Sequence, residues 1–320
     1  MKKTQSSLRG KTVRLALMAL FVAVFVGGVS TYRVQPTLAN HPVLVEGNCD
    51  SPVPGTTIVD KGTCGDFDGD GRIGTAEDTD GADRIFGTLA AALGPGTGAA
   101  AGTGANQNGR VTIVTSGRFA EQLVIGAPVT GLNGGIANPG NVILEAAPGV
   151  NATIDAVLQG DPAGGNNTRQ GQTGIIINFP DATRNATLRN LTIRNWSEGI
   201  RNAANGRVLI DNCKIEGNLN SGVRATEASL TVITNSQIYG NGFRVTTASP
   251  NTPTPGDGVR AEGAAQIRIS DSTVAHNFGT GVNNTTGGPG YISLYHVSTY
   301  FNGVNLAGPI GFNQSDANAQ

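Results

Sequence analysis

The chain has 320 residues, of which only 14% are charged, and its formal net charge is −1 at pH 7. Soluble domains usually carry about a quarter charged residues, so this chain is poor in charged groups. Its net charge close to zero excludes a general electrostatic attraction to nucleic acid or to an anionic membrane. The 47 glycines and 29 asparagines tolerate left-handed backbone and predict a chain with many tight turns.

The first 39 residues have the pattern of an export signal. Basic residues up to Arg14 precede an apolar run from Ala16 to Val29, and small residues stand two positions apart at Thr37 and Ala39. The run is shorter than the roughly 20 residues of a membrane span. We expect residues 1–39 to be removed as a signal peptide, which leaves a secreted protein (periplasm, cell surface or extracellular) without a membrane span. A retained N-terminal anchor is the alternative.

Residues 40–80 are predicted to form an N-terminal segment that contains two of the three cysteines. Cys49 and Cys64 could close a small loop as a disulfide in an oxidising compartment. Their spacing alone leaves open whether they pair.

Residues 66–77, DFDGDGRIGTAE, have the spacing of a calcium-binding loop. Calcium takes six to eight oxygen ligands, which a 12-residue loop supplies from positions 1, 3, 5, 7, 9 and 12, with glycine at position 6. The pattern resembles the EF-hand loop, but the prolines and glycines before Asp66 exclude an entering helix, and calcium sensors work by opening paired helices. A structural Ca²⁺ ion is therefore expected, with a metal-free acidic turn as the alternative. The expected ligands are Asp66, Asp68, Asp70, the carbonyl oxygen of Arg72, and Glu77.

A short helix is predicted over residues 82–94, ADRIFGTLAAALG. Either Asp80 or Asp83 can cap its start, and a Gly-Pro pair ends it. Leu89 and Leu93 lie on one face of this helix, so that face is expected to cover other apolar groups.

Residues 109–125, GRVTIVTSGRFAEQLVI, alternate as two strands around Ser116 and Gly117. A helix reading F-x-T-L-x-x-A-L, a strand, a G-R-F-x-E turn and another strand resemble the start of the pectin-lyase-like proteins. The resemblance implies an all-β fold, a right-handed single-stranded parallel β-helix with a short N-terminal capping helix. Because the calcium loop lies just before that helix, the ion is expected to fix the N-terminal segment to the first coil.

The sequence that follows repeats with a period of about 23 residues. Equivalent turn residues are 22, 23, 36 and 25 positions apart, so one repeat carries an insertion. Such a period is typical of a solenoid with one coil per repeat, and the alternation of period two builds the coil from strands. Residues 81–307 are therefore assigned to the capping helix and β-helix, and residues 308–320 to a C-terminal tail. The turn residues are Asn190, Asn212, Asn235, Asp271 and His296.

The alternation also predicts which side chains point into the coil. Cys213 falls in a column of mostly small residues and is expected to be buried, where a free thiol acts as a small hydrophobe. Two apolar columns are expected beside it: Ile193, Ile215, Ile238, Val274 and Thr299 in one, and Leu188, Ile210, Ile233, Ile269 and Leu294 in the other.

Arginine recurs at one outward position, as Arg201, Arg224 and Arg260. Stacked strands are about 4.8 Å apart, and like charges at that spacing repel each other. The recurrence predicts a binding surface for an extended anion, such as an acidic polysaccharide; a solvated basic face is the alternative. The insertion at residues 243–256 is predicted to form a wall beside these arginines or an inert bulge.

The resemblance leaves open whether the chain is an enzyme. Pectin-lyase-like proteins include lyases, hydrolases, esterases and non-catalytic binders, and the calcium-dependent pectate lyases use an arginine base beside acidic calcium ligands. Arg224 or Arg260 could match that base, and Asp257 and Glu262 are the acidic residues expected nearby. Two or three carboxylates close to the arginines would favour catalysis.

Two functions therefore remain from the sequence. The first is a secreted, calcium-binding monomer that binds an acidic or neutral polysaccharide or a cell-surface glycan on its outer sheet. The second is a polysaccharide lyase or glycoside hydrolase that acts on an acidic polymer. Nucleic acid is not an expected partner.

Overall fold

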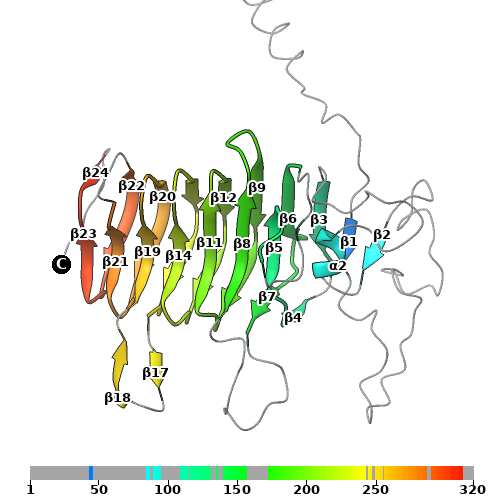
Figure 1. The fold of residues 1–320 in the computed structure, drawn as a ribbon. Coiled ribbons are helices and arrows are strands. Elements are labelled where there is room, and N and C mark those ends of the chain that lie inside the picture. The colour runs from blue at the N-terminus through cyan, green and yellow to red at the C-terminus, as the bar shows by residue number, and fades with distance from the viewer. Residues whose placement is uncertain are drawn as a thin grey trace, which may run out of the picture. The chain divides into compact units, whose positions relative to one another are not determined.

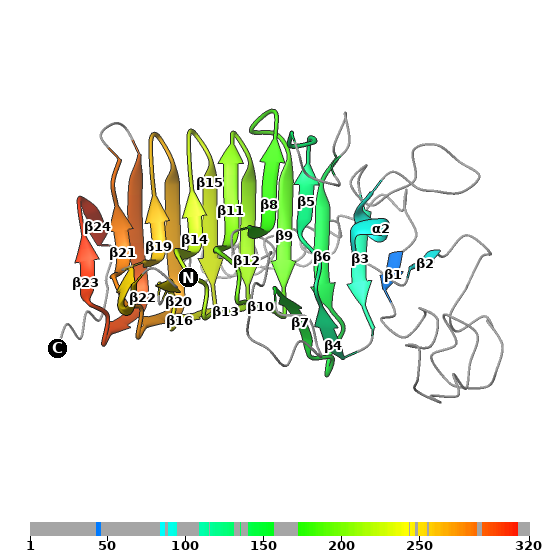
Figure 2. The same cartoon turned by 60° about the horizontal axis from the view of Figure 1, so that its bottom comes forward.

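Parallel strands stack coil upon coil in the computed structural model (Figures 1 and 2). The fold is an all-β right-handed parallel β-helix, which confirms the fold class expected from the sequence. The structure describes residues 43–45, 84–86, 89–94, 109–114, 116–130, 135, 140–156, 172–242, 244–246, 249–254, 256–286 and 290–312.

One side of the coil is a seven-stranded sheet, called sheet B here. Neighbouring strands in it come from successive coils and are all parallel. In spatial order its strands are β5 (Leu123–Gly126), β8 (Thr173–Phe179), β11 (Glu198–Ala204), β14 (Ser221–Ala225), β19 (Asp257–Ala261), β21 (Thr280–Asn284) and β23 (Val304–Ala307).

The other sides form a 15-stranded sheet, called sheet A here, with two branches joined by long strands. The strands β20 (Gln266–Ala275) and β22 (Tyr291–Tyr300) run through a corner of the coil and so belong to both branches. One branch contains β2 (Arg84–Phe86), β1 (Val43–Val45), β3 (Gly109–Ile113), β6 (Val142–Ala146), β9 (Asn185–Arg189), β12 (Arg207–Asp211), β15 (Leu230–Thr234) and β24 (Ile310–Phe312). The other contains β4 (Gly117–Phe119), β7 (Ala152–Asp155), β10 (Leu191–Arg194), β13 (Lys214–Glu216) and β16 (Gln237–Tyr239).

The inward columns stack in the predicted register. Ile193 pairs with Ile215, Ile215 with Ile238, and the column continues to Val274 and Thr299, all of them buried. The second apolar column, from Leu188 to Leu294, is likewise in register and buried. Each coil therefore adds one apolar layer to a continuous core.

Cys213 lies inside the coil, as expected, and its side chain is 3% exposed. Its backbone N–H donates to Ser236 Oγ at 3.1 Å, which links it to the small residue of the next coil. Burial raises the pKa of the Cys213 thiol to about 12, so the thiolate is not populated at neutral pH.

The predicted turn residues all have left-handed backbone, with φ between 48° and 58°. Asparagine and aspartate visit this region more readily than most side chains. A single such residue turns the chain between the two branches of sheet A, which explains why polar residues recur at this corner.

The N-terminal helix is shorter than the sequence predicted. Helix α2 covers only Leu89–Leu93, because residues 84–86 form strand β2 and pair with β1. The prediction that Asp80 or Asp83 caps the helix is therefore wrong: the N–H groups of Leu89 and Ala90 donate to the carboxylate of Glu121, at 3.0 and 2.8 Å. The cap comes from a later coil, so no local pattern announces it.

The β-helix also departs from the prediction at two other places. Residues 109–126 form three strands, β3, β4 and β5, instead of two, because the chain turns two corners of the coil in this stretch. Strand β24 pairs with β22 beyond residue 307, and Ile310 packs against the core, so the sheet continues into the predicted tail.

Residues 1–39 and 40–320 are two separate units of the chain, and the β-helix belongs to the second. The proposed signal peptide, Cys49, Cys64 and the calcium loop at residues 66–77 lie outside the described residues. None of the described helices has the length or the apolar character needed to cross a lipid bilayer.

Candidate ligand-binding face on sheet B

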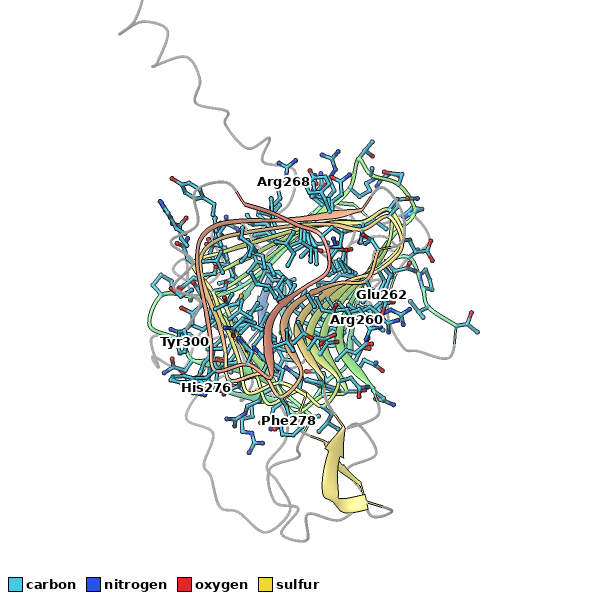
Figure 3. All side chains as sticks on the ribbon, turned by 90° about the vertical axis from the view of Figure 1, so that its left-hand side faces the viewer. Arg260, Glu262, Arg268, His276, Phe278 and Tyr300 are labelled. Atoms are coloured by element: carbon cyan, nitrogen blue, oxygen red, sulfur yellow. The ribbon has the colours of Figure 1, made fainter. Side chains whose placement is uncertain are left out.

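Three arginines stack in one column on the outer face of sheet B. Arg201 in β11 is in register with Arg224 in β14, and Arg224 is in register with Arg260 in β19. The preceding residues, Ile200, Val223 and Val259, are fully buried, so alternation along each strand places the arginines outside. Figure 3 shows Arg260 and Glu262 together on this outer side of the coil.

Arg224 is held between two glutamates from neighbouring coils. Its Nη1 lies 2.6 Å from Glu198 Oε1, and its Nη2 lies 2.7 Å from Glu262 Oε2. Glu198 is 8% exposed and accepts a further hydrogen bond from Thr173 Oγ1 at 3.1 Å. The guanidinium is therefore fixed from both sides.

Glu262 bridges two arginines, one with each carboxylate oxygen. Its Oε2 accepts from Arg224, and its Oε1 lies 2.6 Å from Arg260 Nε. At this distance the two groups form an ion pair, although the angle does not meet the geometry of a hydrogen bond from Arg260 Nε. The bridge relieves the repulsion that two stacked arginines would otherwise have.

Asp257 completes the network at its far end. It is 7% exposed, and its two oxygens accept hydrogen bonds from Thr280 N at 3.1 Å and Asn283 Nδ2 at 2.9 Å. Arg260 Nη1 lies 3.7 Å from Asp257 Oδ2. We call Glu198, Arg224, Arg260, Asp257 and Glu262 together the ion-pair network; its contacts extend from β8 to β21.

The pKa values follow from this pairing. Burial by itself would lower the pKa of Arg224, but the hydrogen bonds to Glu262 and Glu198 outweigh it and raise the pKa above its ordinary value. Burial would raise the pKa of Glu262, yet the hydrogen bond and charge of Arg224, followed by the charge of Arg260, hold it below its ordinary value of 4.5. Both groups are charged at neutral pH.

Arg201 lies outside the ion-pair network. Its Nε is buried without a hydrogen-bond partner, and the guanidinium has no ion-pair partner in the described part of the chain. Glu198, three residues earlier, directs its oxygens to Arg224 and Thr173 instead. Of the three stacked arginines, Arg201 is the cation left available for a ligand.

The structure brings the sequence-predicted residues together but changes their expected state. Arg224, Arg260, Asp257 and Glu262 do lie side by side, as ion pairs that neutralise one another. Among the residues that the structure describes, no group of three or more His, Cys, Asp or Glu side chains could hold a metal ion. The expected continuous cationic ladder is thus replaced by a network of three acids and two arginines, with a formal charge of −1, and by Arg201 outside it.

Sequence reasoning missed Glu198. The preceding strand carries Thr173 at this coil position and the following one Ser221, so no acidic repeat marks it. A weak signal existed, because Asp257 stands two coils later at the same position.

The insertion at residues 243–256 forms a hairpin of its own, β17 (Arg244–Thr246) paired antiparallel with β18 (Ser249–Thr254). It leaves the coil after Gly242, and the chain re-enters at Gly256, one residue before Asp257. Figure 1 shows the hairpin projecting beyond the ends of the neighbouring strands. The hairpin therefore stands at the start of β19, next to the acidic end of the network.

A groove of about 430 Å³ lies elsewhere, over the polar corner of sheet A. It exists because residues 147–151 form a longer turn in one coil, whereas Asn190, Asn212 and Asn235 turn the later coils singly. Its charged residue, Lys214, is paired with Glu216 at 3.1 Å. The groove thus offers amide groups to a ligand, but its one ammonium group is already paired.

Comparison with a family of known proteins agrees with the fold. Residues 141–296 match the family model described as "Right handed beta helix region". Among solved structures, pectate lyase Pel9A is similar with a TM-score of 0.41 and 13% identity, covering 88% of this chain and 80% of that one. The Agl-KA catalytic domain is similar with a TM-score of 0.37 and 15% identity, covering 66% of this chain and 42% of that one. No curated protein matches the sequence.

Proposed function

We propose that this protein binds a polysaccharide on the outer face of sheet B and that Arg201 pairs with a carboxylate of an acidic sugar unit. The observation that carries the proposal is the Arg201 guanidinium, whose Nε is buried and has no partner. A buried donor that stays unpaired costs about 1–3 kcal/mol. A carboxylate can remove that cost and accept two parallel hydrogen bonds from an arginine.

The surroundings of Arg201 favour a sugar polymer over a small anion. The ion-pair network beside it extends over several strands, and its half-exposed groups offer donors and acceptors to hydroxyl groups along that length. The network has three acids and two arginines, so it adds no positive charge to that of Arg201. We therefore expect one charged contact per ligand, and neutral hydrogen bonds elsewhere.

Three carboxylates do lie close to the arginines, at 2.6–3.7 Å, as expected of a catalytic site. They are paired with the arginines, and among the described residues they form no group that could hold a metal ion, so we favour binding over lyase catalysis. A general base must lose its proton near the working pH, but ion pairing raises the pKa of Arg224. Arg260 is ion-paired with Glu262 at 2.6 Å and lies 3.7 Å from Asp257. Incubation with polygalacturonate, followed by ultraviolet absorbance of unsaturated products, tests this: appearance of product would establish the lyase.

Export and calcium binding belong to the same proposal. Removal of residues 1–39 would place the chain where uronate polymers occur, and Ca²⁺ at residues 66–77 would fix the N-terminal segment to the first coil. The double substitution Asp66→Ala and Glu77→Ala is expected to abolish calcium binding and lower the melting temperature. An unchanged melting temperature of the mature protein in chelator would contradict the role of the ion.

Calorimetry with hexagalacturonate tests the proposed contact. Arg201→Gln should weaken binding about tenfold or more, since a hydrogen bond to a charged group contributes about 1.5–3 kcal/mol. Arg207→Gln is the matched control, because Arg207 is exposed on sheet A. Affinity should fall as salt rises, with the modest slope of a single ion pair. Equal affinity of wild type and Arg201→Gln would refute the contact.

A further inference from the structure

Aromatic side chains are concentrated on the last coils of the β-helix. Only 5% of the chain is aromatic, yet Tyr291, Tyr295 and Tyr300 all lie in the single strand β22 and are exposed. Phe301 follows directly and is 74% exposed, the largest value among the exposed apolar side chains of the described residues. An isolated exposed apolar residue is ordinary, but a group of them marks an interaction site.

Two of these rings, Tyr300 and Phe301, contact each other and the ring of His276 at one corner of the coil. His276 packs on Phe301 with ring centroids 5.1 Å apart and planes tilted by 30°. Tyr300 meets both rings edge-on, at 5.8 Å from His276 and 5.4 Å from Phe301. We call His276, Tyr300 and Phe301 the aromatic ridge.

The backbone at this corner is unfavourable for the side chains it carries. The corner residue follows the strand in five successive coils, and its φ is positive in each: Asn195 at 64°, Gly217 at 60°, Gly240 at 63°, His276 at 56° and Phe301 at 52°. Glycine adopts this conformation freely and asparagine and histidine tolerate it, whereas phenylalanine is disfavoured there. The three earlier coils use asparagine or glycine, and the last two carry rings. Strain of this kind at an exposed ring indicates a functional requirement.

The aromatic ridge lies around one corner of the coil from the network on sheet B. The chain passes from His276 through Phe278 to β21, where Thr280 N donates to Asp257 Oδ1 at 3.1 Å. From Phe301 it passes to β23, whose Val304 is in register with Thr280. Figure 3 shows Phe278 at the lower corner of the coil, with His276 and Tyr300 to one side and Arg260 and Glu262 to the other.

We propose that the aromatic ridge is a stacking platform for the apolar face of a sugar ring, at the end of the polysaccharide that contacts Arg201. The inference rests on the proposed function and names a second contact for the same ligand. From β11 to β23 is four strand steps, or about 19 Å along the solenoid axis at 4.8 Å per step. The path around the corner at Phe278 adds to this, so a ligand that contacts both places must have several sugar units and bend around that corner.

The chemistry of the ridge favours a sugar over a second protein. The face of an aromatic ring is negative, and the C–H groups on the apolar face of a pyranose ring carry the complementary partial charge. A stable protein interface covers about 800 Å² on each partner, with about 20–30 residues. Three rings, even with the exposed side chains of Phe278 and Val304 nearby along the chain, are too few for that, and they suit one or two sugar units.

Replacing the rings by the residue of the earlier coils tests the proposal. His276→Gly with Phe301→Gly copies Gly240 and Gly217, so the variant is expected to fold with an unchanged or higher melting temperature. Its affinity for hexagalacturonate and for cellohexaose, measured by calorimetry, should fall about tenfold for the loss of two ring contacts. Tyr295→Ser is the matched control, because Tyr295 is 42% exposed but lies on the other branch of sheet A; its affinity should not change.

The results separate the two proposals. Weaker binding by the glycine variant supports the ridge, whatever the effect of Arg201→Gln. Unchanged binding by the glycine variant, together with weaker binding by Arg201→Gln, overturns the ridge and leaves the proposed function standing. If the wild type binds neither oligosaccharide, both proposals fail. A dimer in sedimentation velocity that the glycine variant loses would also overturn the sugar platform, in favour of self-association.

Discussion

On sheet A, Arg189 lies in register between Glu145 of the preceding coil and Asp211 of the next, whereas on sheet B, Arg224 lies in register between two other arginines. In the first arrangement opposite charges alternate along the solenoid axis, and Arg189 reaches both acids, at 3.4 and 3.1 Å. In the second, acids must come from neighbouring outward positions, and they serve only two of the three arginines.

A second column of sheet A follows the alternating rule. Arg194 lies in register between Asp155 and Glu216 and contacts them at 2.8 and 3.8 Å. In these alternating columns each arginine has an acid on both sides, so no cation is left without a partner. Such columns are best explained by their contribution to the stability of the fold. A column of like charges is different: it can leave one member, here Arg201, without a partner, and that member is the one to test for binding.

The largest expected effect on stability comes from removing the buried acid of an alternating column. Asp155 is 0% exposed and accepts from Arg194 Nε at 2.8 Å and from Asn195 Nδ2 at 2.7 Å. Asp155→Ala should lower the free energy of unfolding by about 3 kcal/mol, because it removes a fully buried carboxylate that pairs with Arg118 and Arg194 at once. Chemical denaturation measures this, with Asp181→Ala, an acid whose side chain is 44% exposed, expected to change stability far less. Similar effects of both would contradict a structural role for the column.

A smaller loss of stability is expected from removing the charge of Glu262 on sheet B. Glu262→Gln removes the charge that bridges Arg224 and Arg260, and both arginines are partly solvated. The free energy of unfolding should fall by about 1 kcal/mol, less than for the buried acid. Glu227→Gln, an exposed glutamate, serves as the control and should stay within about 0.5 kcal/mol of wild type. An increase in stability on Glu262→Gln would show that the bridge is not formed.

Lowering the pH should weaken the ion pairs on both sheets and so destabilise the fold. The pKa values of Glu262 and Asp211 are held below their ordinary values of 4.5 and 3.8, so each carboxylate stabilises the fold above that pH. Their contribution is lost as the pH falls through the lowered pKa of each group in the folded protein. The melting temperature should therefore fall less steeply with acid in Glu262→Gln than in wild type. Parallel curves would exclude Glu262 as a contributor.

The smallest effect is expected inside the coil, as a baseline for the outer columns. Ser236 and Ser272 occupy the position of Cys213 in the next two coils and donate to the carbonyls of Thr234 and Ser270. In Cys213→Ser the hydroxyl can donate to Asp211 O, which the thiol already contacts at 3.4 Å. The free energy of unfolding should change by less than about 1 kcal/mol. A larger loss would show that the packing of the sulfur atom itself stabilises the core.

The fold and its inward columns could be predicted because they follow one period. Ile193, Ile215 and Ile238 are 22 and 23 residues apart, and the same spacing carries through buried positions on both branches of sheet A. The errors lie at the ends, where repetition stops. Residues 84–86 have helical spacing of apolar residues with 89–93, but strand β1 offers them a sheet partner that no local pattern indicates.

The site was predictable only in part, for a related reason. Outward register followed from the repeat, so the three arginines fall in one column as expected. Which acid pairs with which arginine depends on side-chain reach between coils: Glu198 lies 26 positions from Arg224, and Glu262 lies 38 positions from it. The single unpaired guanidinium of Arg201 results from those choices and has no sequence signature.

The crystal structure of this protein with trigalacturonate tests the difference between the two sheets most directly. The account predicts a carboxylate oxygen about 2.7–2.9 Å from the Arg201 guanidinium, with the Arg224–Glu262 and Arg260–Glu262 pairs still formed. A ligand bound to Arg224 or Arg260 with those pairs broken, or bound without contact to Arg201, would contradict it.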